Sequence, residues 1–169
     1  MKLPAKYANM PEPEVVAAIA QAKAALGESL TILGHHYQRD EVIQFADFRG
    51  DSLDLSRRAT EATQAKFIVF CGVGFMAETA AMLAKPEQTV VQPVAEALCP
   101  MARMADAAQV SQAWAVLSAI WDGDLVPITY QNSTADVKAF VGEHDGAVCT
   151  SSNAGRLFEW AFSRSRHIL

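Results

Sequence analysis

The chain has 169 residues, of which 51% are hydrophobic and 20% are charged, so it has enough apolar material to bury a core. Its net charge of −5 argues against a nucleic-acid-binding surface, because phosphate binding needs clustered Lys and Arg. No apolar run reaches the ~18 residues of a membrane span, and we therefore expect a cytoplasmic protein without a membrane partner.

Apolar spacing and Gly, Pro and Ser punctuation predict alternating helices and strands along the chain. Helices are expected at 11–26, 40–45, from 52 onward, 75–83, 110–121, 134–141 and 153–162. Strands are expected at 30–33, 67–70, 89–91, 125–130 and 146–149, and residues 167–169 resemble the start of another. This order is typical of α/β proteins, with αβα sandwich units built on parallel sheets.

In parallel sheets ligands bind beyond the carboxyl ends of the strands, so the residues that follow each strand are candidate site residues. His35, His36 and Tyr37 follow the first strand, and imidazole and phenol groups suit acid–base work on a small molecule. The alternative is that one histidine caps a turn and the tyrosine packs against its neighbours.

Polar residues also stand at three expected helix starts. They are Asp51 and Ser52, the segment 130–134, and the segment 150–153. Ser52 could cap its helix, and free N–H groups at a helix start can bind an anion. Each segment alone could be a plain helix cap, whereas the three together favour a small anionic ligand rich in oxygen.

Three cysteines, Cys71, Cys99 and Cys149, match no local metal motif such as C-x-x-C. Cys71 and Cys149 end strands that are expected to be buried, which is the usual fate of a free thiol. Cys99 lies in an irregular loop before Pro100 and is the best candidate for a metal ligand.

Several blocks of this sequence resemble the quinolinate synthase family. They are GHHYQRDEV at 34–42, ADF at 46–48, GDSL at 50–53, FCGV at 70–73, FMAETA at 75–80, CPMA at 99–102, YQNST at 130–134 and CTSSNA at 149–154. The blocks occur in the family's order and span about residues 29–160, so the resemblance is highly specific.

The resemblance implies three similar αβα domains around a pseudo-threefold axis, with the active site at their junction. It implies a reaction that condenses iminoaspartate with dihydroxyacetone phosphate to give quinolinate for NAD biosynthesis. A [4Fe–4S] cluster would be held by three cysteines, one from each domain, with one iron left open. An L-aspartate oxidase or dehydrogenase that supplies iminoaspartate is the implied pathway partner.

The resemblance also assigns roles to individual residues. Cys99 matches the first cluster ligand, whereas Cys71 and Cys149 do not stand at ligand positions. His35 and Tyr37 match acid–base or orienting residues. The residues that match the family's substrate-binding positions are Asp51, Ser52, Tyr130, Asn132 and Ser151.

Two positions depart from the family pattern: Gly74 stands where members often have His, and Leu98 stands where Gly often precedes the ligand cysteine. The resemblance divides the chain into a first domain at 1–105 and an incomplete second domain at 106–169, without a third. The other two ligand cysteines would lie beyond Leu169, so we expect the chain alone to be inactive. The alternative is a non-catalytic module that binds a dicarboxylate or phosphate.

Overall fold

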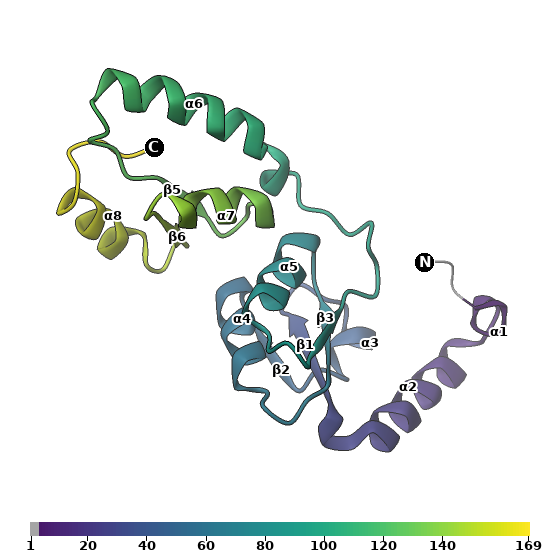
Figure 1. The fold of residues 1–169 in the computed structure, drawn as a ribbon. Coiled ribbons are helices and arrows are strands. Elements are labelled where there is room, and N and C mark those ends of the chain that lie inside the picture. The colour runs from purple at the N-terminus through teal and green to yellow at the C-terminus, as the bar shows by residue number, and fades with distance from the viewer. Residues whose placement is uncertain (1–3) are drawn as a thin grey trace. The chain divides into compact units, whose positions relative to one another are not determined.

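The computed structural model describes residues 4–169, which form two compact units divided between Ala97 and Leu98. Their division falls within the loop at 93–108, where the sequence shows no clear periodicity. Across residues 4–169, every helix is too short or too polar to cross a bilayer. Each unit is described separately below, and the labels follow Figure 1.

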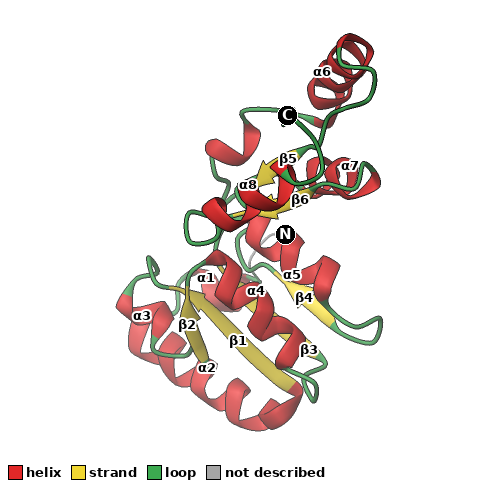
Figure 2. Ribbon diagram, turned by 90° about the vertical axis from the view of Figure 1, so that its left-hand side faces the viewer, coloured by secondary structure: helices red, strands yellow, loops and turns green. Residues whose placement is uncertain are grey.

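The first unit contains a four-stranded parallel sheet in the order β2-β1-β3-β4, seen side by side in Figure 2. The strands are β1 (Leu30–His35), β2 (Phe48–Gly50), β3 (Phe67–Cys71) and β4 (Thr89–Val91). In the register, Leu33 pairs with Phe48 and Phe70, so β1 lies between β2 and β3. The prediction of an α/β fold with parallel strands is confirmed.

Helices α4 (Ser52–Glu61) and α5 (Gly74–Leu83) pack on each other and bury the core of this unit. Phe70, Leu33, Ile68 and Leu55 have no exposed surface. Each of these large side chains contributes about 1.5–3 kcal/mol through burial. The core therefore holds the carboxyl ends of β1 and β3 rigidly, where the candidate site residues begin.

The N-terminal part of the first unit is attached more loosely. It comprises α1 (Ala5–Ala8), α2 (Glu12–Leu26) and the 3₁₀ turn η1 (Gly27–Ser29). The helix predicted at 11–26 is present, yet none of its residues is fully buried. An apolar hollow of about 560 Å³ separates Ile19 of α2 from Ile32 and Val69 of the sheet.

The short strand β2 was not predicted, because three residues give too little periodicity to read. Helix α3 (Asp40–Ile43) precedes it and packs on β1. Gly34 permits this contact, since a Cβ atom there would stand 2.5 Å from Ile43 Cδ1 and 2.8 Å from Ala46 Cβ. A glycine is therefore required one residue before His35.

The residue that caps α4 is Asp51, which corrects the expectation that Ser52 does so. The Asp51 carboxylate accepts hydrogen bonds from the N–H groups of Leu53 and Asp54, both at 2.9 Å. Ser52 is instead the first helical residue, and its carbonyl accepts from the Ser56 hydroxyl at 2.7 Å. The physical reason is that Asp precedes Ser in the chain and is an equally good N-cap.

We expect D51A to lower the free energy of unfolding by about 1 kcal/mol, because two N–H groups lose their acceptor. D51N is the matched control, since asparagine caps as well as aspartate. Urea denaturation followed by circular dichroism measures both variants. Equal destabilisation by the two substitutions would show that the charge, and not the cap, matters.

The second unit has a smaller sheet in which β5 (Ile128–Tyr130) pairs in parallel with β6 (Ala147–Cys149). Its helices are α6 (Ala107–Ile120), α7 (Ala135–Glu143) and α8 (Ala154–Phe162), after a 3₁₀ turn η2 (Met101–Arg103). Helix α6 begins three residues earlier than predicted, because Asp106 and Gln109 form a reciprocal capping box.

Residues 167–169 run parallel to the segment before β5, as the sequence predicted for a further strand. Val126 pairs with Ile168, and Leu169 donates its N–H to the Val126 carbonyl at 3.0 Å. The end of α6 holds this segment, because Trp121 stacks on His167 with centroids 4.2 Å apart and Asp124 pairs with Arg166 at 2.8 Å. The parallel order of the second sheet therefore extends beyond its two named strands.

Candidate functional site

In the first unit, three aromatic rings gather at the carboxyl end of β1. The rings of His35, His36 and Tyr37 have centroids 4.3–4.5 Å apart in all three pairs. His35 is 5% exposed and Tyr37 is 82% exposed, so the group runs from the core to solvent. The two predicted catalytic residues, His35 and Tyr37, are thus in contact.

The hydrogen bonds of the two histidines indicate different tautomers. The Tyr37 N–H donates to His35 Nδ1 at 3.4 Å, which leaves the proton of a neutral ring on Nε2. His36 Nδ1 lies 3.1 Å from the Gly50 carbonyl, which can only accept, so this nitrogen carries a proton. Neutral His35 therefore has a donor at Nε2, and neutral His36 has a lone pair there.

Parallel pairing of β1 and β2 brings Asp51 to the same edge. His35 pairs with Gly50, and Asp51 follows directly. Burial lowers the pKa of His35, the nearby His36 lowers it further, and the Asp51 carboxylate opposes both by raising it. His35 and Asp51 are thus brought together, and Ser52 follows as the first residue of α4.

We expect NMR titration to place the pKa of His35 below its ordinary value of 6.5, because burial disfavours the imidazolium form. D51N should lower this pKa further, since it removes a charge that favours protonation. As pH falls through 6.5, the unfolded chain takes up this proton before the folded one, so the free energy of unfolding should decrease. A His35 pKa above 6.5 would contradict the burial of this ring.

In the second unit, predicted residues from the ends of both strands are in contact. The Tyr130 hydroxyl lies 2.7 Å from the Ser151 hydroxyl, and Tyr130 pairs with Cys149 in the sheet. Thr150 and Ser152 share a second hydroxyl contact at 2.8 Å, and Asn153 accepts from the Thr150 N–H at 2.7 Å. These hydroxyl groups could donate to a carboxylate or phosphate oxygen.

Asn132 and Cys99 meet although they are 33 residues apart. The Asn132 side-chain amide donates to Cys99 Sγ at 3.7 Å. Both residues are adjacent to backbone hydrogen bonds: Gln131 N–H donates to the Cys149 carbonyl at 2.7 Å and continues the pairing of β5 with β6, and Ala102 N–H donates to the Cys99 carbonyl at 3.1 Å in the turn after Cys99. A polar donor on sulfur is favourable for a thiolate ligand.

The prediction of a buried thiol is confirmed for Cys149, whereas Cys71 is only half-buried, like Cys99. Cys149 is buried and Cys71 is half-buried, and burial raises the pKa of both thiols. Cys99 is half-buried and has the donor described above, so it fits one ligand of a metal cluster. Within residues 4–169, no group of three or more His, Cys, Asp or Glu side chains could hold a metal ion.

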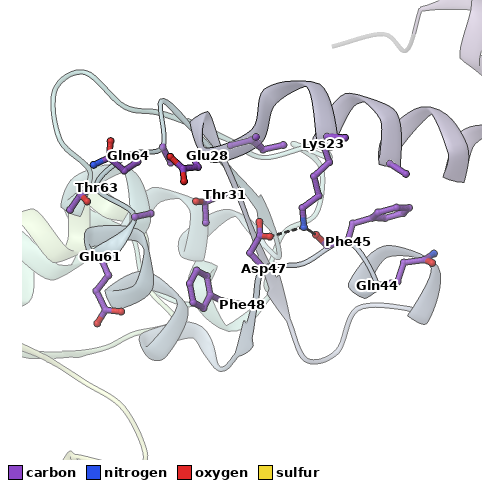
Figure 3. Close-up of a pocket in the computed structure, with 16 residues that line it drawn as sticks. Lys23, Glu28, Thr31, Gln44, Phe45, Asp47, Phe48, Glu61, Thr63 and Gln64 are labelled. Atoms are coloured by element: carbon purple, nitrogen blue, oxygen red, sulfur yellow. Dashed lines mark hydrogen bonds and ion pairs between the residues drawn. The ribbon is translucent and has the colours of Figure 1, made fainter.

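Another hollow of the first unit, whose lining residues Figure 3 draws, lies beside residues at the starts of the strands. It has a volume of about 840 Å³ and is lined by Thr31 and Phe48, near the starts of β1 and β2. Lys23 crosses it to reach Asp47 and the Phe45 carbonyl, both at 2.6 Å. Ligands of parallel sheets bind at the carboxyl ends, so we place the site at His35 despite the size of this hollow.

These features define an α/β protein with histidine, tyrosine and serine side chains at the carboxyl ends of parallel strands. The family model described as quinolinate synthetase A protein, NadA, matches residues 17–169. The chain therefore belongs to this family.

Proteins named quinolinate synthase are similar to almost the whole chain. The relative from Acidobacterium capsulatum is 53% identical over 96% of the chain and 44% of its own length. The relative from Corynebacterium glutamicum is 52% identical over 99% of the chain and 43% of its own length. The relative from Bacillus subtilis is 50% identical over 99% of the chain and 45% of its own length. The chain thus spans less than half the length of these relatives.

Two contacts of candidate site residues, one in each unit, were not predicted. His36 binds the Gly50 carbonyl, and Asn132 binds Cys99. The first depends on the unrecognised strand β2, and the second joins two loops without a shared periodic element. The signal for the Asp51 cap was present, since Asp is a preferred N-cap residue.

Proposed function

We propose that this chain supplies part of a quinolinate synthase, an enzyme of NAD biosynthesis that condenses iminoaspartate with dihydroxyacetone phosphate. The observation that carries the proposal is the family match over residues 17–169, which includes both groups of candidate site residues. The chain covers 45% of the length of the Bacillus subtilis relative, so the proposal assigns these residues a part in the activity of the longer enzyme.

In this proposal the residues of the first unit carry out acid–base chemistry and orient the substrate. Neutral His35 can donate a hydrogen bond from Nε2 or exchange a proton with a substrate oxygen or nitrogen. Tyr37 is exposed beside it and can orient the same substrate through its hydroxyl. Asp51 holds the start of α4 and influences the charge of His35, while Ser52 adds a hydroxyl at the first helical position.

The residues of the second unit bind anionic groups in this proposal. The hydroxyls of Tyr130 and Ser151 already contact each other and can both turn toward a carboxylate or phosphate. Asn132 adds an amide, and Cys99 would be one ligand of a [4Fe–4S] cluster. When bound, such a cluster supplies an open iron that polarises a substrate oxygen.

The test is anaerobic reconstitution with iron and sulfide of two samples: the chain alone, and the chain joined to the segment of the Bacillus subtilis relative that the match does not cover. We expect quinolinate to form from iminoaspartate and dihydroxyacetone phosphate only in the joined protein. Turnover by the chain alone would refute our expectation that it is inactive by itself. A joined protein that holds iron and folds but forms no quinolinate would contradict the proposal.

A second candidate function is the binding of a small dicarboxylate or phosphate without catalysis, which the hydroxyl contacts beside β5 and β6 favour. Isothermal calorimetry with malate and with phosphate on the metal-free chain tests it. Binding that weakens in Y130F or S151A would support this candidate. The absence of detectable heat with either anion would exclude it.

A further inference from the structure

His36 lies beside the residues to which the family resemblance assigns roles, and its contacts are unusual for an exposed side chain. Both its backbone N–H, at 3.2 Å, and its ring Nδ1, at 3.1 Å, point to the same acceptor, the carbonyl of Gly50. Gly50 ends β2, and Asp51 follows it. His36 therefore ties the end of β1 to the residue before the cap of α4.

The ring of His36 also packs against the rings of His35 and Tyr37. It stacks on His35 with centroids 4.4 Å apart and planes inclined by 27°, and it meets Tyr37 edge-on at 4.3 Å. A ring that is fixed at Nδ1 cannot rotate freely, so the stacked His35 ring is also restricted. An exposed histidine with only a packing role would not need the hydrogen bond to Gly50.

We propose that His36 is a positioning residue: anchored to the Gly50 carbonyl through Nδ1, its ring holds the His35 imidazole in one orientation beside Asp51. The role rests on the proposed function, in which His35 acts on the substrate. The burial and charge effects on His35 agree with it, since the nearby His36 lowers the pKa of His35. Asp51 and His36 are the two neighbouring side chains that influence this pKa electrostatically.

Three substitutions separate the anchor from the ring. H36N keeps an N–H donor at the place of Nδ1 but has no ring, H36F keeps a ring without a donor, and H36A has neither. In the isolated chain, long-range ¹⁵N NMR reports the tautomer and the pKa of His35. We expect H36A to raise this pKa toward 6.5 and to mix the two tautomers. H36F should mix them as well, whereas H36N should preserve the parent tautomer more closely.

The same variants can be compared in the joined, reconstituted protein. There H36A should lower kcat by about 10- to 100-fold with little change in KM, because a misplaced catalytic group lowers the reaction rate by about that factor. H36N should recover part of the loss. An unchanged His35 tautomer and pKa in H36A would overturn the inference, whatever the activity. If the parent protein forms no quinolinate, the proposed function fails, and the NMR result on the isolated chain still decides the role of His36.

Discussion

Replacement of Phe70 by alanine is expected to lower the free energy of unfolding of the first unit by about 3–5 kcal/mol. Phe70 is fully buried in β3 and pairs with Leu33 of β1 at the centre of the sheet. Truncation leaves a cavity that the packed helices α4 and α5 cannot close. Because a small domain has only about 5–15 kcal/mol of stability, this loss is a large share of the total.

Phe67 provides the matched control, since it lies in the same strand and is 41% exposed. F67A should lower the free energy of unfolding by no more than about 1 kcal/mol. Urea titration followed by near-ultraviolet circular dichroism compares the two variants with the parent chain. Equal losses for F67A and F70A would mean that the two faces of the sheet are equally covered, which would contradict the fold described here.

The sequence was sufficient to predict the alternation of helices and strands, because buried runs such as 67–70 and capped helices leave strong local patterns. Where prediction failed, the determinants are tertiary or very short. Strand β2 has three residues and is defined by its pairing with β1 rather than by its own pattern. Helix α2 has apolar residues at core spacing, yet it stands off the sheet and is tied to the core through Lys23.

For the candidate site residues, too, the sequence predicted positions along the chain but not the tertiary contacts. The rule that ligands bind beyond the carboxyl ends of parallel strands identified His35 in the first unit and Tyr130 and Ser151 in the second as candidates. Which atoms touch could not be predicted, because the Asn132–Cys99 contact depends on two loops that fold independently of any periodic pattern. Similarly, the choice of Asp51 over Ser52 as cap depends on where α4 begins, and helix ends are uncertain by one or two residues from sequence.

Replacement of Cys99 by alanine is expected to abolish iron binding and to reduce quinolinate formation by at least about 100-fold in the joined, reconstituted protein. Removing a residue that only hydrogen-bonds to a metal ligand typically lowers metal affinity or activity by about 10–100-fold, and removing a ligand itself should lower them more. Cys99 is the thiol of this chain that combines partial exposure with an N–H donor on its sulfur. The measurements are iron content, the cluster's visible absorption and the rate of quinolinate formation.

The other two cysteines of the chain are internal controls. C71A and C149A should keep the iron content and the rate near those of the parent, because burial raises the pKa of both thiols and disfavours the thiolate that a metal requires. Circular dichroism should show that all three variants remain folded, which separates loss of a ligand from loss of structure. Full iron content in C99A, or its loss in C149A without unfolding, would show that the ligand had been assigned to the wrong thiol.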